Sequence, residues 1–372
     1  MKILMHCVYY PPEVGGLESH VHYLCRALGE RGHRVDVVTS RSVAESPRHE
    51  IRDGVHVWRT WFPGKTTVGW IAHAAASIPR ALAVARDADI LHAQAFSSIP
   101  PLQAARAVRR IPLVATLHTS HFLKLAARPI WKTLLGRLVD APDFSLATSR
   151  EIAEVAEGLA PGTHVEALTN GVETSVFQPG EATLPPPREG RVRIVVPRRL
   201  FEKNGVEYFV RALPRVVERV DVEAVIVGDG PERSKLERLV GELELGDRVR
   251  FLGATAHDAM PGILSSADVA VFPSLVEATS VAALECMSCG VPVAASRVGG
   301  LPEIVDETVG TLFAPADPED LARRLTVLLR REDLAAVGRL ARQRVVDRWS
   351  NARLAERHIE IYRELIDRRR AA

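Results

Sequence analysis

The sequence alternates between short apolar runs rich in β-branched residues and segments of helical length along most of its 372 residues. Short apolar strands separated by helices are typical of a parallel sheet covered by helices on both faces. The alternation therefore predicts the α/β class. The strands expected in the first half span 2–10, 34–40, 55–60, 89–94, 112–118 and 144–149, and those in the second half span 193–200, 223–230, 249–253, 269–274 and 291–296.

One segment interrupts this alternation. Around 178–190 the chain reads QPGEATLPPPREG, and its four prolines and two glycines disfavour both a helix and a central strand. We therefore expect two doubly wound, Rossmann-like domains that face each other across a cleft, because ligands of open parallel sheets bind beyond the carboxyl ends of the strands. The expected parts are a first domain at 1–178, a linker at 179–191, a second domain at 192–348 and a C-terminal helix at 349–372 that packs back across the domains.

Composition excludes several classes of protein. Hydrophobic residues make up 47% of the chain and charged residues 25%, as in soluble globular proteins and unlike disordered or fibrous ones. The net charge of +2 argues against a general nucleic-acid binder. No apolar run approaches about 18 residues, so we expect neither a membrane-spanning helix nor a signal peptide. The cysteines are too few for a disulfide framework and fit a reducing cytosol: Cys7, Cys25, Cys286 and Cys289.

The most specific motif is the run at 273–296. Glu277 and Glu285 lie eight positions apart, about two helical turns, so both carboxylates point to one cleft if the helix starts near Thr279. Thr279 and Ser280 then lie beside the free backbone N–H groups of the helix start, which attract an anion such as diphosphate. The alternative is a capped surface helix with two solvated glutamates.

Two further clusters favour a phosphate ligand. Arg198 and Lys203 flank a strand-to-helix turn in PRRLFEKNG, and an arginine fork beside a lysine charge suits a leaving diphosphate. Gly15 and Gly16 form a turn before the first helix, where backbone amides can cradle a phosphate; a plain helix-entry turn explains them equally well. The run GDGP at 228–231 is a weaker signal of the same kind.

Together these motifs resemble the retaining nucleotide-sugar glycosyltransferases of family 4, which have the GT-B fold. The resemblance covers essentially the whole chain and includes His118 in ATLHTSH, TNGVETSVFQP before the linker, FLG and GGLPEIV. It implies an acceptor-side first domain and a second domain that binds the nucleotide-sugar donor. The chain departs from the usual family pattern after Glu277, where Gly and a Phe-Gly pair are common and this sequence has Ala278, Thr279 and Ser280.

The resemblance also implies roles for individual residues. Arg198 and Lys203 would hold the diphosphate and Glu285 the ribose hydroxyls, while Glu277 and His118 would contact the donor sugar. The glycine pair would close over the donor phosphates or help to seat the acceptor. The expected donor-binding set is Gly15, Gly16, Arg198, Lys203, Thr279, Ser280 and Glu285, and the expected catalytic set is His118, Arg198, Lys203 and Glu277.

We therefore expect an enzyme of hexosyltransferase type that moves a sugar from a nucleoside diphosphate sugar to an acceptor hydroxyl with retention of configuration. The acceptor would be a sugar, a polyprenyl or phospholipid, or a small molecule. Retention by double displacement needs a carboxylate on the far face of the sugar, and the sequence points to none, so we favour a front-face path without metal or cofactor. The alternatives are a nucleotide-sugar epimerase of the same fold and a non-catalytic sugar-nucleotide binding module.

Other suggestive groups have simpler explanations. Asp87 and Asp89 have the D-x-D form of a metal site but precede a strand, at the end of the sheet opposite the cleft. Cys286 and Cys289 lack a second pair for zinc, so we expect small buried thiols. Other histidines, among them His20, His22 and His73, are expected on helix surfaces.

A basic stretch is the last candidate. Between 90 and 139 there is no Asp or Glu, and within 122–139 Lys124, Arg128 and Lys132 lie four residues apart beside apolar and aromatic residues. If Pro129 permits one helical face, these charges suit a helix on an anionic membrane surface. The alternative is a helix with a buried apolar side and solvated charges. The expected location is cytoplasmic, with peripheral attachment to the inner face of the membrane under the first alternative.

Overall fold

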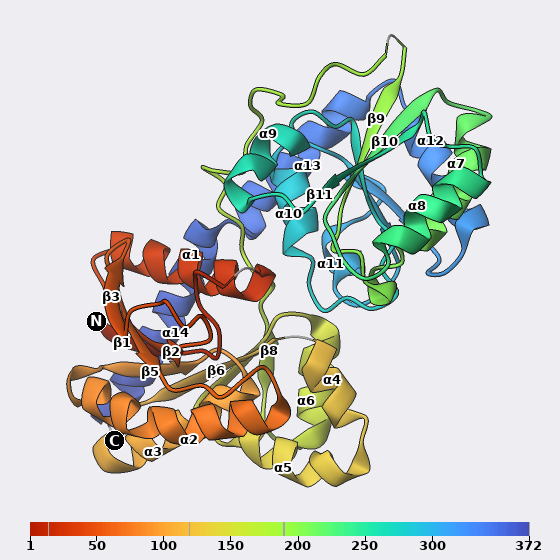
Figure 1. The fold of residues 1–372 in the computed structure, drawn as a ribbon. Coiled ribbons are helices and arrows are strands. Elements are labelled where there is room, and N and C mark those ends of the chain that lie inside the picture. Colours follow the sequence, from red (N-terminus) through yellow and green to blue (C-terminus); the bar gives the residue numbers. More distant parts are fainter. Residues whose placement is uncertain (14, 119, 189, 372) are drawn as a thin grey trace. The chain divides into compact units, whose positions relative to one another are not determined.

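The computed structural model describes residues 1–13, 15–118, 120–188 and 190–371. The chain forms two compact units, each built on its own sheet (Figure 1). Unit 1 consists of Met1–Gly171 and Asn351–Ala372, and unit 2 consists of Val172–Ser350. Both units have mainly parallel sheets with helices between the strands, which confirms the predicted fold class.

The sheet of unit 1 has the strand order β3-β4-β2-β1-β5-β6-β7-β8. The edge strand β3 runs antiparallel to β4, and the other neighbours pair in parallel. The first strand, β1, has β2 on one side and β5 on the other, so the direction of strand addition reverses there. The strands are β1 (Lys2–His6), β2 (Arg34–Ser40), β3 (His49–Arg52), β4 (Val55–Thr60), β5 (Ile90–Ala93), β6 (Leu113–Leu117), β7 (Phe144–Ala147) and β8 (Val165–Ala167).

Helices cover both faces of this sheet. Ile3 and Met5 share a core with α1 and α14, whereas Leu4 shares a core with α2 and α3. Because successive strand residues point to opposite faces, these helix pairs lie on opposite sides of β1 (Figure 1). The helices and 3-10 turns are α1 (Gly16–Glu30), α2 (Thr67–Val84), η1 (Ala85–Asp87), η2 (Phe96–Ser98), α3 (Ile99–Arg109), α4 (Ser120–Ala126), α5 (Pro129–Asp140), α6 (Arg150–Leu159) and α14 (Asn351–Ala371).

Unit 2 has a parallel sheet in the order β11-β10-β9-β12-β13-β14. Its first strand, β9, again has later strands on both sides, so the switch point lies between β9 and β12. The strands are β9 (Val192–Pro197), β10 (Val222–Val227), β11 (Val249–Gly253), β12 (Val269–Phe272), β13 (Val293–Ser296) and β14 (Gly310–Phe313). The helices and 3-10 turns are η3 (Glu202–Asn204), α7 (Val206–Val217), α8 (Arg233–Glu242), η4 (His257–Ala259), α9 (Met260–Leu264), α10 (Val281–Ser288), α11 (Leu301–Ile304), α12 (Pro318–Leu329) and α13 (Leu334–Arg348).

The structure divides the chain after Gly171, whereas the sequence placed the first boundary at residue 178. Phe177 is fully buried in a core of unit 2, which attaches the intervening residues to that unit. The expected linker at 179–191, apart from Glu189, which lies outside the described residues, is also bound to unit 2. There the N–H groups of Thr183 and Leu184 donate to the Gly262 carbonyl at 3.1 Å and to the Ser266 hydroxyl at 3.1 Å, so the chain passes between units at 171–172 and at 350–351.

The basic stretch does not form one continuous helix. Arg128 has an extended backbone (φ −96°, ψ 121°) between α4 and α5, because a residue before proline is pushed out of the helical region. The prediction that Lys124, Arg128 and Lys132 share one helical face is therefore wrong, although all three side chains are exposed. Of the apolar neighbours, Phe122 is fully buried and Ile130 is 85% exposed.

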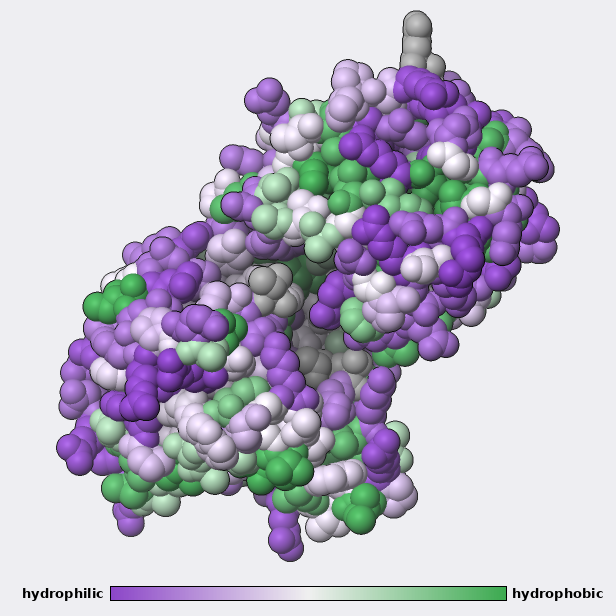
Figure 2. Space-filling view, viewed as in Figure 1, coloured by the Kyte–Doolittle hydropathy of each residue, from purple (hydrophilic) through white to green (hydrophobic). Residues whose placement is uncertain are grey.

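Helix α2 has exposed apolar residues on one side and a buried stripe of small residues and a histidine on another. With η1 it spans Thr67–Asp87, and by length and composition alone this segment could cross a membrane, which is weak evidence because core helices pass the same test. Val68 and Ile71 are 74% and 63% exposed, and Figure 2 shows apolar surface on unit 1 in the region of α2. A four-residue spacing places the buried stripe of α2 on its inner side: Gly69, His73, Ser77 and Ala81.

Candidate functional site

Polar side chains gather in unit 2 at the carboxyl ends of β9 and β12, the two strands of its switch point. Arg198 follows β9 directly, and Glu277 lies in the loop after β12. Open parallel sheets bind ligands at this position, because the loops there diverge and leave a crevice. Arg198 and Glu277, which the sequence predicted in two separate clusters, are therefore brought together where a ligand is expected.

Arg198 is held by three contacts. Its Nη2 donates to the Glu277 carboxylate at 2.6 Å, the Ser274 hydroxyl at 2.7 Å and Asn204 Oδ1 at 2.8 Å. The side chains of Arg198 and Glu277 are only 10% and 15% exposed. The guanidinium also lies over the Phe272 ring, 5.6 Å from its centroid. A charge-assisted contact of this length in a largely buried place fixes the position of the cation.

Lys203 lies in the turn η3 and is exposed. Its carbonyl oxygen accepts hydrogen bonds from the N–H groups of Leu275 at 2.8 Å and Val276 at 3.3 Å. The turn that carries Lys203 is therefore tied to the loop that carries Glu277. The structure thus brings the two predicted cations, Lys203 and Arg198, to loops that share backbone and side-chain contacts.

Two glycines allow these loops to pack closely. A Cβ atom at Gly299, whose φ is +52°, would lie 1.6 Å from the carbonyl oxygen of Glu277. A Cβ atom at Gly228, whose φ is +142°, would lie 2.2 Å from the carbonyl oxygen of Arg198. Only glycine fits such distances to backbone atoms. The glycine runs at 228–231 and 299–300 therefore support the backbone on which the Arg198–Glu277 pair stands.

Helix α10 begins at Val281, two residues later than the expected start near Thr279. Ser280 is its N-cap, and the Ser280 hydroxyl accepts a hydrogen bond from the N–H of Ala283 at 3.3 Å. The predicted position of Ser280 at the helix start is therefore confirmed, while Thr279 lies just before it. The remaining free N–H groups of the first turn can attract an anion.

Glu285 lies further along α10 and is 7% exposed. Its Oε1 contacts Nε2 of His257 at 2.8 Å, a partner that the sequence did not suggest. The hydrogen bond to Glu285 raises the pKa of His257 above its usual 6.5, despite the opposing effect of burial. Glu277 and Glu285 thus have different partners, an arginine for one and a histidine for the other.

In unit 1 the predicted glycines and His118 also follow sheet strands at the carboxyl edge. Gly15 is the N-cap of α1 and Gly16 is its first residue, as expected for a turn before the first helix. A Cβ atom at Gly15 would lie 2.2 Å from Oε2 of Glu18. His118 follows β6, and Gln94 follows the adjacent strand β5.

His118 is buried beside Gln94. Its Nε2 contacts Gln94 Oε1 at 2.8 Å, and because an amide oxygen only accepts, Nε2 carries the proton. Its Nδ1 is buried without a hydrogen-bond partner among the described residues. Burial, followed by the neighbouring His20 and His358, lowers the pKa of His118 well below 6.5. His118 is therefore a neutral imidazole whose Nδ1 can still accept a hydrogen bond.

His20 and His73 are only 3% and 0% exposed, so the prediction that they lie on helix surfaces is wrong.

The groups that the sequence analysis set aside have structural surroundings. Asp89 Oδ2 accepts from the N–H of Lys2 at 2.8 Å, and Asp87 pairs with the Lys2 ammonium at 3.6 Å, at the amino end of β1. Cys286 and Cys289 are buried as expected, and burial raises the pKa of Cys289 to about 12. Within the described ranges, no group of three or more His, Cys, Asp or Glu side chains is placed to hold a metal ion.

Four contacts of the predicted residues were not foreseen: Asn204, Ser274, His257 and Gln94. The positions of three of these residues in the sequence could have suggested a place in the site. Ser274 and Gln94 stand just beyond strand ends, and Asn204 is the neighbour of Lys203. His257 lies in a 3-10 turn distant in sequence from Glu285, and only the fold reveals the pair.

The two halves of the chain match two different protein-family descriptions. Residues 14–176 match the family described as Glycosyltransferase Family 4, and residues 185–344 match the family described as Glycosyl transferases group 1. A phosphatidylinositol N-acetylglucosaminyltransferase component from Arabidopsis thaliana is 30% identical over 336 residues, which cover 87% of this chain and 73% of that protein.

Solved structures share the architecture. The sucrose-phosphate synthase of Thermosynechococcus elongatus aligns with a TM-score of 0.84 at 23% identity, over 98% of this chain and 99% of that one. The Anabaena protein HepE, solved in complex with UDP-glucose, aligns with a TM-score of 0.74 at 20% identity, over 98% and 100% of the two chains. At these identities the likeness establishes the fold.

Proposed function

The chain belongs to glycosyltransferase family 4 and has the GT-B fold, and we propose that it transfers a sugar from a nucleoside diphosphate sugar to an acceptor hydroxyl with retention of configuration. The transfer proceeds without a metal ion and by a front-face path. The donor binds to unit 2 and the acceptor to unit 1.

The observation that carries this proposal is the buried contact between Arg198 and Glu277, with Lys203 on the adjoining loop. Cleavage of the anomeric bond leaves negative charge on the departing diphosphate. A fixed guanidinium, a nearby ammonium and the free N–H groups at the start of α10 stabilise that charge without reorganisation during the reaction. Glu277 holds Arg198 with Oε2, so its Oε1 can accept a hydrogen bond from a sugar hydroxyl.

The nucleotide end of the donor would be held by Glu285. His257 orients this carboxylate through Oε1, so Oε2 faces a ribose hydroxyl in our proposal. The complex of HepE with UDP-glucose supports a nucleotide sugar as donor. A screen of nucleotide sugars identifies the base and the sugar.

His118 acts in this proposal as a positioning group for the donor sugar. Its pKa lies well below 6.5 because of burial, so the ring does not serve as a proton donor to the leaving phosphate at neutral pH. Nδ1, which has no hydrogen-bond partner in the part of the chain that the structure describes, can instead accept a hydrogen bond from a sugar hydroxyl. In a front-face path the departing phosphate takes the proton of the acceptor hydroxyl, which requires no enzymic nucleophile. A double displacement needs a carboxylate nucleophile, and the Glu277 carboxylate is instead paired with Arg198, which supports the front-face path.

The enzyme is proposed to work in the cytoplasm, with a sugar, a lipid or a small molecule as acceptor. The Arabidopsis relative is named for a lipid, phosphatidylinositol, which supports a lipid-borne acceptor. The exposed Lys124, Arg128 and Lys132 would then assist attachment to an anionic membrane from two separate helices.

The screen of nucleotide sugars tests the donor. Each is tested for thermal stabilisation, which grows with the logarithm of ligand concentration over Kd. The best donor is then incubated with Lys203→Ala, which we expect to lose about 10²- to 10³-fold in kcat, because one charge at the leaving group is removed. Lys235→Ala, which removes an exposed lysine of unit 2 paired with Glu207, is the matched control and should retain activity.

The same experiment separates the alternatives. Conversion of the donor to another sugar nucleotide without any acceptor indicates an epimerase. Stabilisation by a donor with no turnover across a panel of sugars, lipids and small molecules indicates a binding module. Equal kcat in Lys203→Ala and Lys235→Ala contradicts the proposed leaving-group role.

A further inference from the structure

Unit 1 contains a hollow of about 800 Å3 that the proposed donor site does not use. It lies beside α2, where β2 and β4 end, and its lining includes Arg41 and Thr60 from just beyond or at these strand ends. The hollow therefore reaches the carboxyl edge of the sheet, where parallel sheets bind ligands, and extends from there along α2 to Arg80 and Ala83. None of the residues assigned to the donor lines it.

The lining of this hollow is basic. Four arginines contribute to it, and no aspartate or glutamate is among its lining residues: Arg41, Arg48, Arg59 and Arg80. A wall with one sign of charge raises the local concentration of ligands of the other sign. Arginine in particular presents a planar fork that matches the oxygens of a phosphate.

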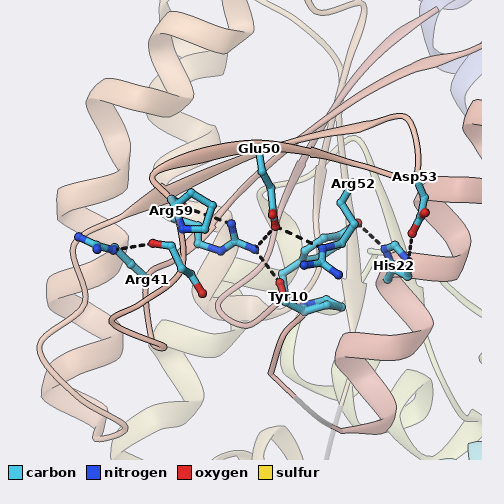
Figure 3. Close-up of polar contacts among 10 residues, drawn as sticks. Tyr10, His22, Arg41, Glu50, Arg52, Asp53 and Arg59 are labelled. Carbon is cyan, nitrogen blue, oxygen red and sulfur yellow. Dashed lines mark hydrogen bonds and ion pairs between the residues drawn. The ribbon is translucent and has the colours of Figure 1, made fainter. Parts of the chain in front are cut away.

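Arg59 forms the buried base of the group. Its side chain is 2% exposed and donates to Glu50 at 2.6 Å and to the carbonyl oxygen of Pro11 at 2.7 Å. Figure 3 shows Glu50 between Arg59 and Arg52, whose Nε donates to the same carboxylate at 3.2 Å. Burial alone would raise the pKa of Glu50, but hydrogen bonds from both arginines lower it overall, so the carboxylate is ionised. One carboxylate facing two guanidiniums leaves an excess of positive charge.

The other three arginines are not neutralised by carboxylates of the described part of the chain. Arg41 donates to the carbonyl oxygens of Ala44 at 2.6 Å and Ser46 at 2.9 Å, which holds the loop after β2 but leaves its charge unbalanced (Figure 3). Arg48 is exposed. Arg80 is exposed and lines the hollow, and its guanidinium lies over the ring of Trp58, 4.8 Å from the centroid, which restricts its movement.

Apart from Thr60, the rest of the wall is apolar or aromatic. Trp61, which is 63% exposed, and Phe62 follow β4, and Ala76, Pro79 and Ala83 come from α2. An exposed tryptophan beside arginines suits a ligand with an anionic group attached to a ring or an apolar body. Inorganic ions alone would leave this part of the wall unused.

We propose that this hollow binds a phosphate ester carried by the acceptor, with Arg48 and Arg80 contacting the phosphate and Trp61 packing against the body of the molecule. The assignment to the acceptor rests on the proposed function, whereas the binding of a phosphate does not. Arg41 and Arg59 hold the surrounding loops and add charge. The phosphate ester comes either from a lipid headgroup or from a soluble phosphorylated compound.

Calorimetric titration with inorganic phosphate tests the site in the full chain. We expect Arg48→Ala combined with Arg80→Ala to raise the phosphate Kd by about tenfold or more, because each lost charge-assisted hydrogen bond weakens binding by roughly this factor. Arg369→Ala combined with Arg370→Ala, which removes two exposed arginines of α14, is the charge-matched control and should bind phosphate like the wild type. Failure of the wild type to bind phosphate, or equal Kd values in the double variant, overturns the proposal.

The donor site is tested separately in the same titration. If Lys203→Ala loses phosphate binding and the double variant does not, the phosphate occupies the donor site and the hollow is not its site. If the double variant loses phosphate binding but no nucleotide sugar is turned over, the anion site stands and the proposed function fails. With an active donor and a phosphorylated acceptor, the double variant should raise the acceptor KM about tenfold while the donor KM is unchanged.

Vesicle sedimentation distinguishes the source of the phosphate. Vesicles of phosphatidylcholine with phosphatidylglycerol should bind the wild type, and the double variant less, if the ester belongs to a lipid. Binding of glycerol 3-phosphate to the wild type, with no difference between these vesicles and pure phosphatidylcholine, indicates a soluble ester. If the double variant binds both the anionic vesicles and glycerol 3-phosphate as well as the wild type does, the proposal is overturned.

Discussion

Replacing Arg198 with alanine should both slow transfer and destabilise unit 2. The Arg198–Glu277 contact measures 2.6 Å, and the two side chains are 10% and 15% exposed. Removing one partner of a buried pair costs about 3 kcal/mol, because it leaves the other charge without compensation. Removing the cation from the leaving group costs a further 3 kcal/mol or so in the transition state, which corresponds to about 10²- to 10³-fold in kcat.

A second ion pair of unit 2 isolates the effect of burial. Arg215 and Glu319 are also 2.6 Å apart, but their side chains are 55% and 72% exposed. Arg215→Ala should therefore cost at most about 1 kcal/mol and leave kcat unchanged. Arg198→Lys keeps the charge but loses the fork, so its kcat should lie between those of Arg198→Ala and the wild type.

Scanning calorimetry gives the stability of these variants, and initial rates with the donor found in the screen give kcat. If Arg198→Ala unfolds at the same temperature as Arg215→Ala, the buried contact does not support unit 2 as argued. If Arg198→Ala keeps near wild-type kcat, Arg198 does not stabilise the leaving diphosphate.

Three further predictions concern pH, the loop after β12 and metals. Burial lowers the pKa of His20 to about 3 and those of His73 and His358 to about 4, so the unfolded chain binds protons below pH 6.5 that the folded chain does not. The free energy of unfolding should thus fall between pH 6.5 and pH 4 by about 1.4 kcal/mol per pH unit for each histidine. If the urea concentration at the unfolding midpoint stays constant over this pH range, the burial of these rings is contradicted. Gly299→Ala should displace the Glu277 carbonyl and lower kcat at least about tenfold, whereas Gly241→Ala, with open space around its Cβ, should not; equal rates refute the packing argument. Activity should survive EDTA, and activity restored only by Mg²⁺ or Mn²⁺ would return attention to Asp87 and Asp89.

The alternation of apolar runs predicted eleven strands, and all of them are present in the structure. Three more strands were missed because they lack that signal. β3 reads HEIR and is a charged edge strand, β8 has only three residues, and β14 reads GTLF without a run of β-branched residues. Their pairing partners, rather than their own propensities, make them strands.

Domain boundaries were harder to predict than strands. The proline-rich segment at 179–191 looks like a linker, yet Leu184 packs against a core of unit 2. Proline and glycine exclude regular structure but do not exclude attachment to a surface. The C-terminal helix, by contrast, was expected to pack back, and α14 does belong to unit 1, where Tyr362 is fully buried in the core.

The sequence predicted those candidate site residues that lie at the ends of strands. Arg198 and Glu277 were each predicted as site residues, and the sheet brings them into contact because β9 and β12 are neighbours that end at the same edge. The contact of Glu285 with His257 could not, because it joins a helix and a 3-10 turn 28 positions apart. The arginine hollow was also invisible in the sequence, since its members come from a loop, two strand ends and a helix.

The most direct test of the account is the anomeric configuration of the first product formed from the donor. Proton NMR of a reaction stopped early reads this configuration from the coupling of the anomeric proton, before any later change can occur. A product with the same configuration as the nucleoside diphosphate sugar is the result that we predict. A product with the opposite configuration contradicts the retaining, front-face transfer at the Arg198–Glu277 site.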